Sequence, residues 1–278
     1  MKAKLIGFIV ILAVPVIFVL LMNVTTTFNI TAQVERIEFD SDEKNPIEWE
    51  LRKAIITENA DESSKRVFTG TLTISASSHV VVERVSNGPL TISIDSLQDN
   101  KQVGTYLSEN NSSSIQTSKK IGITIDNTTS FVNKGQTVLL PLIGKDVTLG
   151  IVVNDKLCGS AAILRSGKVT MLGKTILGDV YKVMESTLDA GDQITMKGQE
   201  SLSYGFVLLD ERPALTASYR TIGKYALLSH TGFNSYRMSA SWLDLLMKNT
   251  FVTALYTILG AIYSIYKLFS KKEKTLYE

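Results

Sequence analysis

Few side chains in this sequence have the type and spacing that catalysis or metal binding requires. The 278 residues include two histidines, His79 and His230, and one cysteine, Cys158. A single cysteine excludes a disulfide within the chain and a multi-cysteine zinc site. We expect each imidazole to be held by structural hydrogen bonds, and we expect no metal site. Cys158 is expected to be a small buried residue, or alternatively one half of an intermolecular bridge.

The segment from Gly167 to Thr175 combines glycines with lysine and threonine, as phosphate-binding loops do. Such a loop needs the spacing GxxxxGK[ST] and a following helix, because its backbone amides must enclose a phosphate. Here five residues separate Gly167 from Gly173, and no helical pattern follows. We therefore expect two strands joined at Gly173 and no nucleotide site.

The segment from Met184 to Asp192 (MESTLDAGD) resembles the SMxPTLxxGD box of type I signal peptidases. These are membrane-anchored, β-rich serine proteases. Val183 stands where that family has its nucleophilic serine, and Ser186 stands in place of the proline. Valine offers neither a proton nor a lone pair for nucleophilic catalysis. The pattern therefore predicts no protease activity, but a strand, a turn at Gly191 and a second strand.

The N-terminal end of the chain has the first of two long apolar runs. Leu5 to Met22 comprises 18 residues without a charge, and Lys2 and Lys4 precede it. Roughly 20 apolar residues span a bilayer, and flanking lysines favour the cytoplasmic side. The alternative is a cleaved signal peptide, whose apolar region usually has about 7–15 residues. We expect residues 1–4 to be cytoplasmic and residues 5–23 to form an uncleaved signal-anchor helix.

The second uncharged run extends from Asn249 to Tyr266 and is followed by lysines. The SxxD pattern at Ser241 to Asp244 is typical of a helix start. We expect residues 241–269 to form a helix that contains a second transmembrane span, with a basic cytoplasmic tail over residues 270–278. An amphipathic helix in the membrane interface is the alternative, although such a helix carries charges along its polar face.

Small side chains fall on one face of this C-terminal helix at helical spacing. A stripe of small residues lets helix backbones approach each other within a bilayer. We predict that the stripe packs on the first helix or on another copy of the chain. Its members are Thr253, Thr257, Gly260, Ala261 and Ser264.

The region from 24 to 240 shows the two-residue periodicity of strands rather than the periodicity of helices. Its apolar runs are short, rich in Thr, Val and Ile, and separated by Gly, Asn and Asp, as in sandwiches and barrels. We predict an all-β ectodomain, an antiparallel sandwich or barrel of one or two modules. A Ser/Asn-rich stretch near 97–120 is the expected sub-boundary or a mobile loop, and Thr57 to Arg66 is expected to be a polar loop. Gly70–Ser75 and Gly88–Ser93 are near copies, which we interpret as neighbouring strands.

The charge balance limits the kind of partner. With 29 basic and 27 acidic residues the formal net charge is +2, which excludes a nucleic-acid binder that works by bulk charge. We expect both termini in the cytoplasm and residues 24–240 outside it, in a periplasm, at a cell surface or in a lumen.

These expectations favour a non-enzymatic binding, sensing or assembly component. We expect it to be integral to the membrane, to need no cofactor or nucleotide, and to bind a protein partner or further copies of itself. Exposed strand edges or the stretch near 97–120 would meet the partner. Two alternatives stay open: an oligomeric membrane effector that permeabilises or deforms the bilayer, and an enzyme with an unrecognised site.

Overall fold

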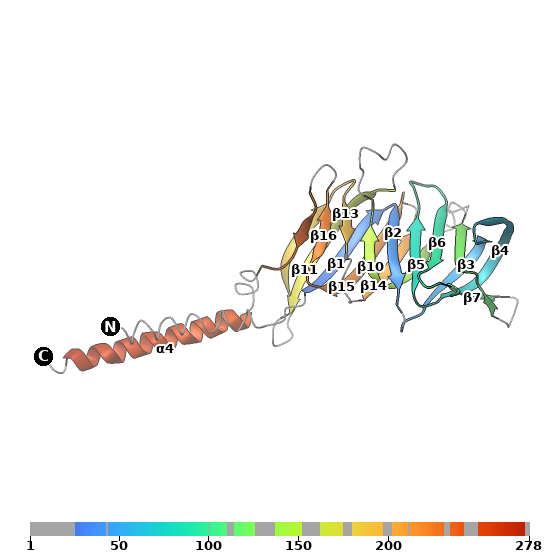
Figure 1. The fold of residues 1–278 in the computed structure, drawn as a ribbon. Helices are drawn as coiled ribbons and strands as arrows, with labels where there is room; N and C mark the ends of the chain where they lie inside the picture. The colour runs from blue at the N-terminus through green and yellow to red at the C-terminus, as the bar shows by residue number, and fades with distance from the viewer. Residues whose placement is uncertain are drawn as a thin grey trace. The chain divides into compact units, whose positions relative to one another are not determined.

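The computed structural model describes residues 26–42, 44–99, 101–109, 114–125, 137–151, 162–174, 180–196, 202–210, 212–230, 234–241 and 250–275. In these ranges the chain forms a series of strands followed by one helix (Figure 1). The elements are β1 (Thr26–Val34), β2 (Arg36–Ser41), β3 (Ile47–Glu58), β4 (Asp61–Ile74), β5 (Ser78–Glu83), β6 (Leu90–Ser96), β7 (Gly104–Ser108), β8 (Ile115–Gln116), β9 (Lys120–Ile125), β10 (Val138–Leu149), β11 (Leu164–Lys174), β12 (Val180–Leu188), β13 (Gln193–Thr195), β14 (Ser203–Leu209), β15 (Leu215–Gly223), β16 (Ala226–Ser229), β17 (Tyr236–Met238) and α4 (Thr250–Thr275).

The chain divides into two units. The larger unit, residues 27–170 and 185–239, consists of strands and is called the β body below. The smaller unit comprises residues 1–26, 171–184 and 240–278. Within it, the structure describes the adjoining ends of β11 and β12 and the helix α4.

Antiparallel pairing connects the strands of the β body into long ladders. One ladder runs β8–β7–β4–β3–β9–β6–β5–β2–β10. Strand β10 continues it, because its first half pairs with β14 and its last residues pair with β13. From there β14 leads to β15, and β13 leads to β16 and β17. The predicted antiparallel, sandwich-like all-β fold is therefore confirmed.

Alternation along the strands builds the core. In β2, for example, Ile37 and Phe39 are buried, while the charged side chains that alternate with them point outward. The largest fully buried side chain is Trp49 on β3, whose indole N–H donates to the carbonyl oxygen of Pro141 at 2.9 Å. Proline has no backbone N–H, so it is tolerated in β10 where that strand needs no donor.

A buried carboxylate stands at the junction between β1 and β2. Glu35 is the single residue that separates these strands, and it is 3% exposed. Its carboxylate accepts hydrogen bonds from the backbone N–H of Ser86 (3.0 Å) and of Ile163 (3.3 Å), and it pairs with Arg165 at 2.7 Å. One side chain thus links the β1–β2 junction to two other segments of the chain, one at Ser86 and one at Ile163 and Arg165.

A buried guanidinium follows the end of β5 and forms hydrogen bonds with the segment before β15. Arg84 is 3% exposed and donates to the carbonyl oxygens of Arg212 and Ala214, both at 2.9 Å. Its burial lowers the pKa of Arg84 from the usual value for arginine. Because a buried charge is costly unless it is hydrogen-bonded, these carbonyls have to stay in place around it.

The stretch from Thr57 to Arg66 is not the polar loop that we predicted. It belongs to the β3–β4 hairpin, whose turn is Asn59 and Ala60, with φ of 53° and 59°. Two residues with positive φ form the turn that suits a two-residue hairpin. The start of β4 is exposed on both faces, so it lacks the apolar alternation by which a strand is recognised.

The stretch near 97–120 and the near copies can also be located in the order of strands. The stretch near 97–120 contains β7 and β8, and β7 pairs with β4. The near copies Gly70–Ser75 and Gly88–Ser93 are not neighbouring strands, because β4 pairs with β3 and β7 whereas β6 pairs with β5 and β9. Their similarity reflects the same local alternation in separate parts of the ladder.

The helical predictions are met only in part. Helix α4 begins at Thr250, inside the range 241–269 that we predicted to be helical, and extends to Thr275. No helix within the described parts of the chain is both long enough and apolar enough to cross a membrane. The transmembrane portion of the predicted fold is thus not supported by these parts, and the first expected span, residues 5–23, lies outside them.

Replacing Glu35 tests whether the junction stabilises the β body. We expect Glu35→Ala to lower the free energy of unfolding by about 2–4 kcal/mol, because two backbone N–H groups and Arg165 lose their acceptor. Urea unfolding followed by tryptophan fluorescence measures this change. The matched control Glu48→Ala removes an exposed carboxylate from β3 and should change stability by less than about 0.5 kcal/mol. Equal effects of the two variants would contradict the role assigned to Glu35.

Candidate functional site

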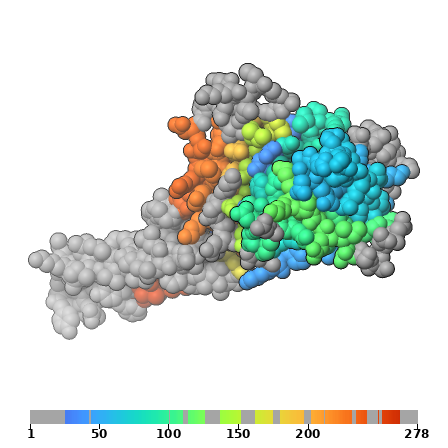
Figure 2. All heavy atoms as spheres, turned by 45° about the vertical axis from the view of Figure 1, so that its right-hand side comes forward, coloured from blue at the N-terminus to red at the C-terminus, as the bar shows by residue number. Residues whose placement is uncertain are grey.

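Four neighbouring strands, β2, β5, β6 and β9, form an outer face of the β body (Figure 1). Their inward side chains are apolar, and their outward side chains are polar or small. Atoms of residues 47–125, coloured from blue to green, gather into one contiguous part of the surface in Figure 2. Strand register places outward side chains in rows across the face, and the middle row consists of Glu38, Val81, Ser93 and Gly122.

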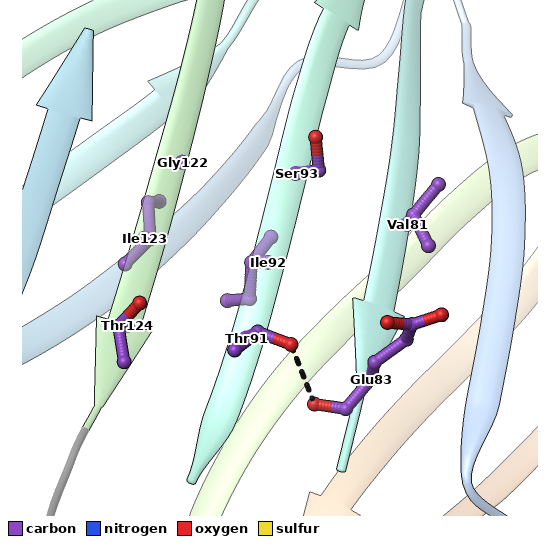
Figure 3. Close-up of a pocket in the computed structure, with 8 residues that line it drawn as sticks. All are labelled: Val81, Glu83, Thr91, Ile92, Ser93, Gly122, Ile123 and Thr124. Atoms are coloured by element: carbon purple, nitrogen blue, oxygen red, sulfur yellow. Dashed lines mark hydrogen bonds between the residues drawn. The ribbon is translucent and has the colours of Figure 1, made fainter. Parts of the chain in front are cut away.

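A depression of about 210 Å³ lies in this face, across β5, β6 and β9 (Figure 3). Pockets for drug-sized ligands have volumes of about 300–1,000 Å³. This one therefore has room for a single side chain rather than for a cofactor. The residues that line it are Val81, Glu83, Thr91, Ile92, Ser93, Gly122, Ile123 and Thr124.

Gly122 makes the depression possible. A Cβ added to Gly122 would meet no atom within 4 Å, so neither packing nor a close backbone requires glycine there. By contrast, a Cβ at Gly205 would lie 2.1 Å from the carbonyl oxygen of Ser218. Glycine weakens a strand, and in strand interiors it often marks a place where a ligand or another backbone approaches closely.

His79 lies on the same face, in the row next to the depression. Its Nδ1 is 2.6 Å from a carboxylate oxygen of Asp40, and its Nε2 is 3.9 Å from a carboxylate oxygen of Glu38. Strand register places Asp95 opposite His79 on β6. The hydrogen bond with Asp40 is the main reason why the pKa of His79 is raised, and the charges of Glu38 and Asp95 add to it.

The other histidine has a similar partner in a different part of the β body. His230 Nδ1 is 2.6 Å from a carboxylate oxygen of Asp192, and the ring stacks on Tyr236 with 5.4 Å between centroids. The second carboxylate oxygen of Asp192 accepts the backbone N–H of Asp189 at 2.8 Å. This pair thus fixes the turn before β13. Among the described residues, no group of three or more His, Cys, Asp or Glu side chains has a metal-binding arrangement.

Gly173, Val183 and Gly191, which belong to the two motifs considered in the sequence, lie in strands or in a turn. We predicted that Gly173 joins two strands. Instead it lies within the continuous strand β11, where an added Cβ would clash with the ring of Tyr181. Val183 is a buried residue of β12. Gly191 has φ of 87° in the turn between β12 and β13, as the strand–turn–strand interpretation predicted. Cys158 lies outside the described residues.

A second surface, here called the β10–β14 patch, is apolar. Leu139 is 54% exposed, Tyr204 is 51% exposed and Phe206 is 38% exposed. Strand pairing places Phe206 beside Pro141 and Tyr204 beside Ile143. The patch consists of the exposed Leu139, Tyr204 and Phe206 and the half-buried Pro141, Ile143 and Leu208.

The sequence itself contains a signal for the β10–β14 patch. The strands that form it are nearly continuous apolar runs, VLLPLI from residue 138 and FVLL from residue 206. A strand with one face in solvent usually alternates. Such runs therefore indicate apolar side chains on the outer face as well as in the core.

In α4, the predicted helix-packing residues are all exposed. A Cβ added to Gly260 would meet nothing within 4 Å. The hydroxyl of Thr257 donates to the carbonyl oxygen of Thr253, and that of Ser264 donates to the carbonyl oxygen of Gly260, both at 2.9 Å. The stripe Thr253, Thr257, Gly260, Ala261 and Ser264 thus presents a surface of small side chains, two of whose hydroxyls already donate within the helix.

Comparison with known proteins identifies no relative: no family model, no curated protein and no solved structure matches this chain.

The raised pKa of His79 predicts a pH-dependent contribution to stability. A histidine whose pKa is raised on folding stabilises the fold below its unfolded pKa of about 6.5, and the contribution disappears as the pH rises through the folded pKa. Because the side chain is 34% exposed, we expect less than about 1 kcal/mol. Unfolding measured at pH 5.5 and 8.5 should show that His79→Gln and Asp40→Asn each reduce the excess stability at pH 5.5. An unchanged pH dependence in His79→Gln would contradict the assignment.

Proposed function

We propose that this chain is a non-enzymatic, membrane-tethered protein that binds a protein partner outside the cytoplasm through the β10–β14 patch. The observation that carries the proposal is the side-by-side exposure of Leu139, Tyr204 and Phe206 on a sheet face. Contiguous exposed apolar surface marks interaction sites, and aromatic side chains are enriched in the centres of protein interfaces. Scattered single apolar residues would not support this reading.

The composition of the patch favours a protein partner over a small molecule. Its side chains stand on paired strands of a sheet, which hold them rigidly in register. The neighbouring strand β15 is polar on this face, where Ser218 lies 3.4 Å from the hydroxyl of Thr31 and Arg220 donates to Asn29 at 2.8 Å. An apolar centre with a polar rim is the usual plan of a protein interface.

The membrane part of the proposal rests on the two ends of the chain. Residues 5–23 have the length and the flanking lysines of a signal anchor. In α4, Ile258, Ile262 and Ile265 are more than half exposed. Bonding of Thr257 and Ser264 to their own helix suits an apolar environment, because it leaves fewer unpaired polar groups. We therefore propose that α4 contributes a second membrane segment, with both termini in the cytoplasm.

The membrane-effector alternative has weaker support. A water-filled path would need polar groups that face the water. The hydroxyls of Thr257 and Ser264 already donate to carbonyl groups of α4. The small-residue stripe, including Gly260, instead suits packing on another helix or on a second copy.

Site-specific photo-crosslinking tests the proposed partner surface. A photoreactive amino acid at Phe206 in the full chain, irradiated in the host membrane, should give one discrete adduct. The control position is Leu107 on β7, which is 46% exposed and lies outside the patch. An adduct of twice the mass of the chain would identify a second copy as the partner. No adduct at Phe206, or the same adducts from both positions, would contradict the proposal.

Reporter fusions test the proposed topology. Fusions after residues 40, 150 and 278, each made with a reporter active outside and one active inside the cytoplasm, should give outside, outside and inside. The reason is that the lysines flank both apolar runs on their outer sides. An outside signal at 278 would contradict the second span, and a cytoplasmic signal at 150 would overturn the whole arrangement.

A further inference from the structure

The Gly122 depression is a second recognition site on the β body, distinct from the β10–β14 patch. We propose that it binds the basic side chain, lysine or arginine, of an extended segment of a partner protein. This inference uses a different face of the β body and does not depend on the proposed function. It rests on the open backbone at Gly122 and on the charge of the depression.

Neither the backbone conformation nor the packing of the fold requires glycine at position 122. Gly122 is not one of the glycines with a positive φ, and a Cβ added to it would meet no atom within 4 Å. Its neighbours across the sheet are also short, Ser93 on β6 and Thr57 on β3. Within the depression, Ser93 and Gly122 therefore give a low floor on β6 and β9, on which the methylene groups of a long side chain would lie.

The charge of the depression selects the group that enters. Glu83 is the charged residue among those that line it, and it forms an ion pair with Arg36. Arg36 also pairs with Glu38, so two carboxylates share one guanidinium and the group keeps a net negative charge. An anion would be repelled by this carboxylate, and an apolar group would remove water from it without replacing the lost hydrogen bonds. A cationic donor satisfies the carboxylate and is attracted by it.

The remaining polar groups are compatible with a cationic donor. The hydroxyls of Thr91, Ser93 and Thr124 line the depression, and a hydroxyl accepts as well as donates. One carboxylate oxygen of Glu83 accepts from Arg36, which holds the carboxylate at the rim. An ionised carboxylate has sites for about four hydrogen bonds, so Arg36 leaves acceptor capacity for an incoming group.

A pair of blocked pentapeptides tests this assignment. The first, Ala-Thr-Arg-Thr-Ala, carries arginine, and the second carries citrulline, which has nearly the same shape without the charge. Line broadening of the peptide resonances in NMR reports binding to the full chain. We expect the arginine peptide to bind and the citrulline peptide to bind at least about tenfold more weakly, because one charge-assisted interaction is lost.

Two variants of the protein locate the binding. Glu83→Gln should weaken binding of the arginine peptide about tenfold, and Gly122→Val should abolish it by filling the depression. Gly122→Val should keep or raise the urea midpoint, because its Cβ has space and valine favours strands. Glu48→Gln, which neutralises an exposed carboxylate of β3 outside the depression, should bind like the wild type.

The result that overturns the proposal is specific. Equal binding of the two peptides, absence of binding by both, or undiminished binding by a folded Gly122→Val variant would each refute it. If Gly122→Val does not fold, Gly122→Ala replaces it and should weaken binding while leaving the urea midpoint unchanged. Undiminished binding by Glu83→Gln would refute the role of the carboxylate in any case.

Discussion

The buried carboxylate of Glu35 is the constraint on which the rest of the β body depends. It occupies the single residue between β1 and β2, and these strands join different partners: β1 pairs with β11 and β15, whereas β2 pairs with β5 and β10. The chain therefore changes from one part of the ladder to another without a loop. The backbone N–H and C=O of Glu35 stay paired with Ile163 and Arg84, and its carboxylate ties the junction to Ser86 and to the segment of Ile163 and Arg165. Buried charge is costly, so this position specifies one arrangement of the three segments.

Strand alternation in the sequence predicts the fold class but not the connections. Segments with one apolar face, such as Leu90–Ile94, are recognised as strands because their side chains alternate. The β3–β4 hairpin is missed because both faces of its outer half are exposed. Pairing between β2 and β10 joins residues more than a hundred positions apart, and no local pattern records which strands will meet. Expectations for the two ends depend on residues that lie partly outside the described structure.

The residues that make up each candidate surface are defined only once the strands are in register. Gly122 is one of 18 glycines in the sequence, and its significance depends on lying beside Ser93 in the depression. The β10–β14 patch likewise needs two strands that are distant in the sequence. The surfaces differ in chemistry, since one is apolar and flat and the other is small, polar and negatively charged at its rim. A partner that used both would combine apolar contact area with one charged anchor, and the anchor would provide specificity more than affinity.

The pairing of β1 has a consequence for the synthesis of the chain. Residues 26–34 leave the ribosome first among the strands, but their partners β11 and β15 are made much later. Until then the backbone edges of this strand, which carries the core residues Phe28, Ile30 and Val34, lack their pairing partners. A β-prone segment with an unpaired edge is prone to aggregation. The nascent protein therefore has a vulnerable period between the synthesis of β1 and that of its partners, during which a chaperone would protect this strand.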